Sequence, residues 1–119
     1  MKRNNDLIRA ILAEVEKHKG GNRTLSLSKR QFVDTFPGLD ADTLNGHIQL
    51  LKEVGFVEAA PHQFGWSIVG LTWSGHDFLT DSKCPNIWER AKQVGGDLSF
   101  DVFRSALKDA ALKAIQGVF

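Results

Sequence analysis

The first apolar stripe of the chain lies close to its N-terminus. From Asp6 onward, apolar residues recur at steps of three and four positions, namely at Leu7, Ile8, Ile11, Leu12 and Val15. This spacing places them on one face of a helix. Asn4 or Asn5 can cap the start, and Gly20-Gly21 can end the helix because glycine tolerates the left-handed turn that closes one. The pattern predicts a first helix in this segment.

A short extended segment and a second helix are predicted next. Residues 24–28 alternate polar and apolar side chains, as a brief edge strand or an extended lead-in does. Ser28 can cap a short helix with an apolar face, and Pro37-Gly38 breaks that helix. The face consists of Phe32, Val33 and Phe36.

A third helical pattern begins at Asp40 and ends at Gly55. Its apolar positions are spaced by four and three residues at Leu44, Ile48 and Leu51. Two helices joined by a tight turn that contains glycine predict a helix-turn-helix.

Two strands follow, separated by residues 61–65. Residues 56–60 and 66–72 favour strands, and the Pro-His-Gln-Phe-Gly segment between them favours a turn. A hairpin after a helix-turn-helix is the wing of a winged helix.

Further helices are predicted after the hairpin. A short helix over 72–79 is followed by one that begins at Pro85 and by one that begins near Ser99. The pattern therefore predicts an α+β, mostly helical fold: a winged helix-turn-helix with two additional C-terminal helices. We expect a single domain over 1–119, with a winged-helix core over 1–81 and a helical extension over 82–119.

One hydrophobic core is expected, because the inward positions of these elements must cover one another. Its predicted members are Leu7, Ile11, Leu44, Ile48, Leu51, Phe56, Ile68, Leu71 and Phe78. Three tryptophans, Trp66, Trp73 and Trp88, are also of a kind that fills a core.

Composition agrees with one small globular domain. The chain has 119 residues, of which 42% are apolar and 24% charged, so neither disorder nor a fibrous repeat is indicated. The single cysteine, Cys84, has no partner for an internal disulfide, and acidic residues near the N-terminus do not fit a signal peptide. These features predict a cytoplasmic location and no membrane association.

Charge is unevenly placed although the net charge is only +1. Residues 1–30 hold eight basic residues against three acidic ones, whereas residues 31–62 hold one against five. The N-terminal segment is therefore the basic part of the chain.

Several segments can be compared with known families by their exact sequence as well as by their hydrophobic pattern. They are MKRNNDLIRAILAEVE, GHIQLLKEVGFVEA, LTWSGHDFL, NIWERAK and GGDLSFDVFRSALKDAA. Together they resemble the domain-of-unknown-function 2513 family of short bacterial and phage proteins. The resemblance spans nearly the whole chain, and LTWSGHDFL followed by NIWERAK is its most specific part. It implies a winged-helix fold and a bacterial or phage setting, and it carries over no functional residues.

Catalytic and metal sites are poorly supported. Ser74, His76 and Asp77 are near neighbours on one short helix, where the two ring nitrogens of the histidine cannot readily meet nucleophile and carboxylate on opposite sides. The four histidines share no metal-ligand spacing, and the paired glycines lack the signature of a phosphate loop. We expect no catalytic residues, no metal and no cofactor, and so no enzyme.

The function that the pattern favours is DNA binding by a transcriptional regulator through the third helix. Asn45 and Gln49 are expected on its outward face, where both amides can pair with adenine in the major groove. Basic residues elsewhere would supply the phosphate contacts that the acidic third helix lacks. The candidate DNA-binding residues are Lys2, Arg3, Arg23, Lys29, Arg30, Thr43, Asn45, Gly46, Gln49, Lys52 and His62.

A protein-protein interaction module with the same fold is the alternative: an antitoxin-like protein, an inhibitor or an adaptor. The last helix also carries an apolar stripe that could cover the core or pack against a second copy as a homodimer. That stripe consists of Phe103, Leu107, Ala110 and Ala114.

Overall fold

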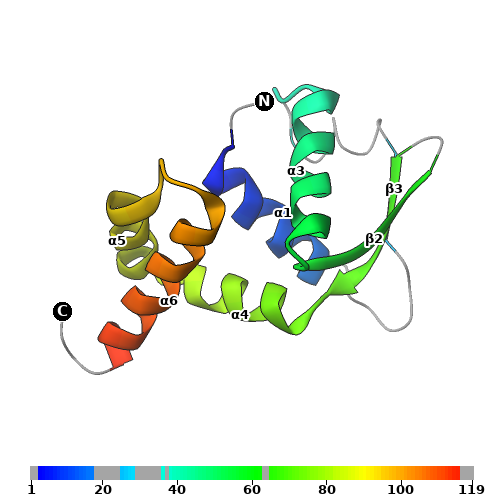
Figure 1. Cartoon of the computed structure of the whole chain (residues 1–119). Helices are drawn as coiled ribbons and strands as arrows, with labels where there is room; N and C mark the ends of the chain where they lie inside the picture. Colours follow the sequence, from blue (N-terminus) through cyan, green and yellow to red (C-terminus); the bar gives the residue numbers. More distant parts are fainter. Residues whose placement is uncertain (1–2, 18–24, 29–35, 37, 63–64, 116–119) are drawn as a thin grey trace. The chain divides into compact units, whose positions relative to one another are not determined.

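The computed structural model describes residues 3–17, 25–28, 36, 38–62 and 65–115. Its contacts divide the chain into an N-terminal unit, Met1–Gly75, and a C-terminal unit, His76–Phe119. The described elements form a mostly helical α+β fold (Figure 1), which confirms the predicted class. The expected single domain with a subdivision after residue 81 stays a prediction.

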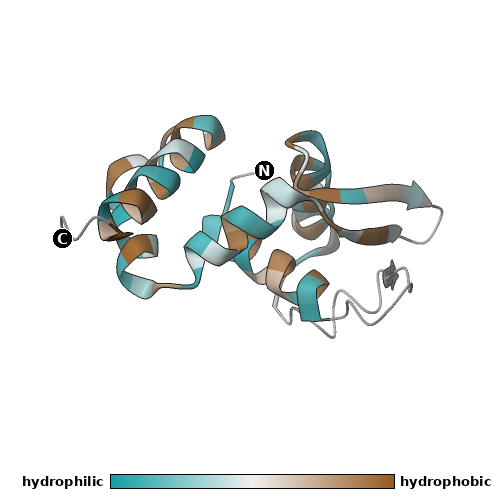
Figure 2. Ribbon diagram, turned by 90° about the horizontal axis from the view of Figure 1, so that it is seen from below, coloured by the Kyte–Doolittle hydropathy of each residue, from teal (hydrophilic) through white to brown (hydrophobic). Residues whose placement is uncertain are grey.

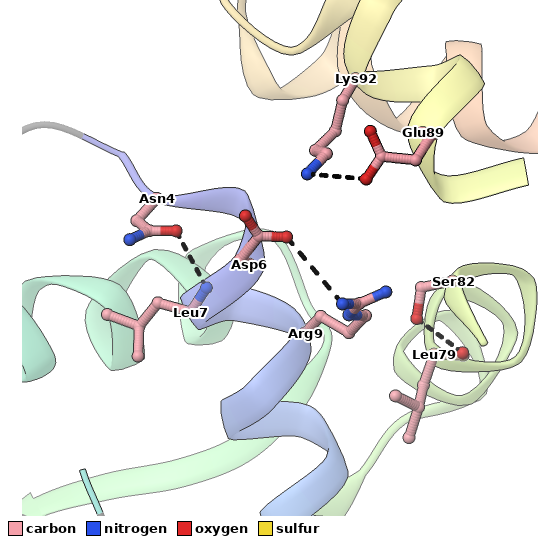
Figure 3. A network of polar contacts seen from close by, with 8 residues as sticks. All are labelled: Asn4, Asp6, Leu7, Arg9, Leu79, Ser82, Glu89 and Lys92. Atoms are coloured by element: carbon pink, nitrogen blue, oxygen red, sulfur yellow. Dashed lines mark hydrogen bonds and ion pairs between the residues drawn. The ribbon is translucent and has the colours of Figure 1, made fainter. Parts of the chain in front are cut away.

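The first helix, α1, runs over Asn5–Lys17. Asn4 caps it, because its side-chain oxygen accepts a hydrogen bond of 3.1 Å from the backbone N–H of Leu7 (Figure 3). Arg9 and Asp6 form an ion pair one turn apart. The first of the two expected caps is therefore the one used, and the expected end at Gly20-Gly21 lies outside the described residues.

The sheet has three antiparallel strands in the order β1-β3-β2. They are β1, Leu25–Ser28; β2, Val57–His62; and β3, Gly65–Leu71. The predicted edge strand and hairpin are confirmed, but Pro61, His62 and Gly65, which were expected in the turn, belong to the strands. The second helix, expected between Ser28 and Phe36, lies almost wholly outside the described residues.

The helix α3, Ala41–Glu53, has the ends that its sequence predicts. Asp40 is the N-cap, with its side chain accepting a bond of 2.7 Å from the backbone N–H of Thr43. After the helix, Gly55 has a φ of 79°, and the Phe56 N–H bonds the Leu51 carbonyl at 2.9 Å. This is the left-handed closure that favours glycine.

The core of the N-terminal unit lies between α1, α3 and the sheet. α1 contacts both β3 and α3, and α3 contacts β2. Helical segments in Figure 2 alternate brown and teal along their length, as expected of elements that bury one side. Of the predicted core residues in this unit, all are buried except Leu71, which is half-buried.

The C-terminal unit holds the last seven residues of α4, Trp73–Ser82, with α5, Pro85–Gly95, and α6, Phe100–Ile115. Its core is a cluster of four aromatic rings whose contacting centroids lie 5.3–6.3 Å apart. The rings belong to Phe78, Trp88, Phe100 and Phe103. Phe78 is thus buried as predicted, but within this cluster.

The apolar stripe expected to mediate a homodimer lies largely inside the C-terminal unit. Phe103, Leu107 and Ala110 are buried, because α6 packs against α5. At Gly95 the two helices come so close that an added Cβ would lie 3.4 Å from the Cβ of Ala106. Three of the four side chains assigned to self-association are therefore already buried within their own chain, and Ala114 is half-buried.

Polar groups in this unit are also satisfied locally. The buried Ser82 hydroxyl donates to the Leu79 carbonyl at 2.7 Å, and Lys92 pairs with Glu89 at 3.2 Å (Figure 3). Lys92 also lies over the Trp88 ring, 6.0 Å from its centroid.

The surroundings of Asp81 disfavour the charged form of its carboxyl group. Partial burial and then the nearby Asp77 raise its pKa, while Lys108 acts in the opposite direction. The native state is therefore penalised above the raised pKa, and this penalty disappears as the pH falls below the ordinary aspartate value.

We expect Asp81→Asn to stabilise the protein near neutral pH by less than about 1 kcal/mol, because solvent still screens this half-buried group. Thermal unfolding near neutral pH and in acid would measure the gain, which should vanish in acid. Asp97→Asn makes the same change at an exposed position between α5 and α6. An equal gain from both variants would contradict the assigned cause.

Candidate nucleic-acid interface

The outward face of α3 carries the predicted recognition residues. Asn45, Gln49 and Lys52 are exposed, and Thr43 and Gly46 are half-buried at its sides. The opposite face is fully buried through Leu44, Ile48 and Leu51. The predicted division of this helix into inward and outward positions is therefore confirmed.

A tryptophan from the sheet joins two of these side chains. The indole N–H of Trp66, on β3, donates to the side-chain oxygen of Asn45. The ammonium group of Lys52 lies over the same ring, 5.9 Å from its centroid. Trp66 itself is only 3% exposed, so a buried ring from the sheet orients two polar residues on the exposed face of α3.

The other candidates on α3 bond within the helix. The Gln49 amide nitrogen donates to Glu53 at 3.0 Å, and the Thr43 hydroxyl donates to Asp40 at 2.9 Å. The backbone N–H of Thr43, followed by its hydroxyl, lowers the pKa of the Asp40 carboxyl. That negative charge therefore persists at the start of α3.

The charge of this face is unfavourable for DNA, as its sequence predicts. Asp40, Asp42 and Glu53 are all exposed, against the single exposed Lys52. A DNA-binding role would require phosphate contacts from other segments.

The segment that contains Arg3 and Asn4 is held beside α3 by a buried histidine. His47 is 0% exposed; its Nδ1 lies 2.7 Å from the Thr43 carbonyl, and its Nε2 accepts from the backbone N–H of Asn4 at 2.9 Å. The imidazole ring of His47 thus connects Asn4, the residue after Arg3, to α3. Arg3, whose Nε donates to Asn5 at 2.9 Å, is the predicted basic residue that the described structure brings to this helix.

The remaining candidates are the four other basic residues and His62. Lys2, Arg23, Lys29 and Arg30 lie outside the described residues, and His62 is described only as the last residue of β2. Two residues of the site were missed from the sequence, Trp66 and His47. The sequence did indicate that His47 is buried, because His47 falls on the apolar stripe with Leu44 and Leu51.

Other candidate chemistry finds little support. Ser74, His76 and Asp77 occupy the first turns of α4, and Gly75 between them packs against the backbone of Phe56. No cluster of three metal-ligating side chains occurs among the described residues. Within the same part of the chain, every helix is too short or too polar to cross a bilayer.

The expectation that Trp73 belongs to a core is wrong. It is the first residue of α4 and is 86% exposed. Gly75 takes the inward position of that first turn, and two residues along a helix differ by about 200° in direction.

Comparison with known proteins gives a family and one relative. Residues 2–99 match the family described as "Hypothetical protein (DUF2513)". The chain is 32% identical over 115 residues to a Haemophilus influenzae protein described as "Uncharacterized protein", covering 93% of this chain and 92% of the relative. No solved structure matches.

Proposed function

Because the chain belongs to the DUF2513 family, whose description names no activity, we propose its function from the exposed face of α3. The protein is a non-enzymatic winged-helix regulator of transcription that binds double-stranded DNA. It acts in the cytoplasm of a bacterium or of a bacterium infected by a phage.

The observation that carries this proposal is the contact of Trp66 with Asn45 and Lys52. A side chain that reads a base must be held in a defined orientation, and an indole donor does this for Asn45. Lys52 adds a cation on the same surface. Base-reading and phosphate-binding groups thus stand together on the helix that a winged helix places in the major groove.

The acidic residues on this helix lead to a testable prediction. Replacing Asp42 with Asn should tighten non-specific binding to DNA, because it removes a repulsion between a carboxylate and the phosphates. The gain should be about fivefold or less at low salt, since two unit charges 4 Å apart in water interact by about 1 kcal/mol. Fluorescence anisotropy with a labelled duplex would measure it.

Glu14→Gln is the matched control, because it removes one negative charge from α1 instead. It should tighten binding less than Asp42→Asn does. Equal gains would mean that net charge, and not the position of α3 against DNA, controls affinity.

The proposal itself is tested by the same titration with the unaltered protein. Affinity should fall steeply as salt rises, because bound phosphates release their counterions. No binding to any duplex at low salt, with the protein folded by circular dichroism, would contradict DNA binding.

A protein-protein interaction module is the second candidate, and the exposed apolar residues of the N-terminal unit favour it. Trp73 is 86% exposed and Val69 is 61% exposed. Exposed tryptophans are among the residues that contribute most to protein interfaces. In that case Trp73→Ala should abolish capture of a partner while Asn45→Ala should not.

A further inference from the structure

His47 is a polar residue on the inner stripe of α3, which is otherwise apolar. It shares this stripe with Leu44 and Leu51, and it is 0% exposed. Burying a polar ring costs free energy unless its polar atoms are hydrogen-bonded. Both ring nitrogens of His47 lie within hydrogen-bond distance of a backbone group, so these two bonds are what the histidine provides and an apolar residue would not.

The two backbone partners determine the tautomer of the ring. The N–H of Asn4 can only donate, so Nε2, at 2.9 Å, carries no proton and accepts. The carbonyl of Thr43 can only accept, so Nδ1, at 2.7 Å, carries the proton and donates. The neutral imidazole therefore connects the residue before α1 to the first half of α3.

This connection lies at one border of the exposed face of α3. Residues two apart on a helix differ by about 200° in direction, so His47 and Asn45 lie on opposite sides of α3. Asn45 contacts Trp66 of the sheet, whereas His47 contacts the N-terminal segment. In a helix-turn-helix, base edges are contacted mainly by the N-terminal part of the recognition helix, which is the part of α3 that this segment flanks.

The flanking segment carries a positive charge that the start of α3 lacks. Arg3 is half-buried, and its Nε donates to Asn5 in the first turn of α1 at 2.9 Å. Asp40 and Asp42, at the start of α3, are exposed and acidic. An arginine held beside them offers a phosphate contact at the place where the side chains of α3 would repel phosphate.

We propose that His47 is a positioning residue for DNA binding, which holds Arg3 where it contacts a phosphate beside the groove that α3 enters. The inference rests on the proposed DNA-binding function. His47 itself does not touch DNA and acts through the backbone of Asn4.

The test is a double-mutant cycle with the full-length protein, measured by anisotropy titrations of a labelled duplex over a range of salt concentrations. Arg3→Gln should lower the slope of log affinity against log salt by about 0.9, the value for one phosphate contact. That slope corresponds to about eightfold weaker binding at 0.1 M salt, relative to 1 M. In a His47→Leu background, where Asn4 has lost its acceptor, Arg3→Gln should weaken binding less than about twofold.

Two controls distinguish positioning from a general effect on the fold. Lys17→Gln removes the same charge from an exposed residue at the other end of α1, and its effect should be the same with and without His47→Leu, because distant sites act additively. His47→Gln is the conservative variant, since its amide oxygen can accept from Asn4. It should restore the effect of Arg3→Gln to about fourfold or more, which a purely structural role of the ring would not require.

A second pair of variants covers the case in which His47→Leu does not fold. Asn4→Ala and Asn4→Pro both lose the side-chain cap of α1, but only Asn4→Pro also loses the N–H that donates to His47. Arg3→Gln should keep its full effect in the Asn4→Ala background and lose it in the Asn4→Pro background.

The outcomes separate the two proposals. If the unaltered, folded protein binds no duplex at low salt, the DNA-binding function fails and this inference with it. If the protein binds DNA but Arg3→Gln has no effect on it, the inference alone is overturned. The same holds if Arg3→Gln weakens binding equally in the unaltered, His47→Leu and Asn4→Pro backgrounds.

Discussion

Gly75→Ala is expected to lower the free energy of unfolding by about 3 kcal/mol or more. A Cβ at this position would lie 2.1 Å from the backbone oxygen of Phe56, far inside van der Waals contact. Overpacking against side chains typically costs about 1–3 kcal/mol, and a backbone oxygen cannot turn away as a side chain does. The same oxygen accepts from the Thr72 N–H at 3.0 Å, so displacing it also disturbs the start of α4.

Denaturant unfolding followed by far-ultraviolet circular dichroism would measure this loss. Gly70→Ala is the control, because a Cβ at Gly70 on β3 would meet nothing within 4 Å. It should change stability by less than about 1 kcal/mol. Equal unfolding midpoints for Gly75→Ala and the unaltered protein would show that the close approach to Phe56 is absent in solution.

Ile48→Ala and Leu51→Ala should each cost about 2–5 kcal/mol, by loss of transfer free energy and by the cavity that remains. Both side chains are 0% exposed on the inner face of α3. The loss would be a large share of the roughly 5–15 kcal/mol that stabilises a typical domain. The same unfolding experiment measures it.

Gln49→Ala controls for the change in helix propensity. Gln49 is the exposed neighbour of Ile48 and bonds only weakly to Glu53, so its loss should cost less than about 0.5 kcal/mol. A similar small cost for Ile48→Ala would contradict the buried position of Ile48.

The helix α3 shows how far local pattern reaches. Its start at Asp40 and its closure at Gly55 were predictable, because a side-chain cap and a left-handed glycine act within a few residues. Its inward stripe followed from helical spacing alone. Local chemistry therefore specifies this element almost completely.

The long-range hydrogen-bond partners of α3 could not be predicted from local pattern. Asn45 was expected to face outward with its amide available, but its oxygen is bonded to Trp66, 21 residues away. His47 bonds to Asn4, 43 residues away. Which hydrogen bonds form across such separations depends on how the elements pack, and apolar periodicity does not contain that information.

The same limit explains the apolar stripe of α6. Its spacing predicted a surface that needs to be covered, and Phe103, Leu107 and Ala110 are buried in the structure, while Ala114 is half-buried. Periodicity cannot distinguish a second copy of the chain from α5 of the same chain as the covering element. The close approach of α5 and α6 at Gly95 allows α5 to cover the stripe. No local pattern indicated this approach.

The different surroundings of the three tryptophans provide the protein with intrinsic fluorescent reporters. Trp66 lies in the core of the N-terminal unit, Trp88 lies in the aromatic cluster of the C-terminal unit, and Trp73 is in water. In a Trp73→Phe background, a further Trp66→Phe or Trp88→Phe change leaves one buried emitter in one unit. The red shift of each emitter on unfolding would show whether the two units melt together or in separate steps, without any attached dye.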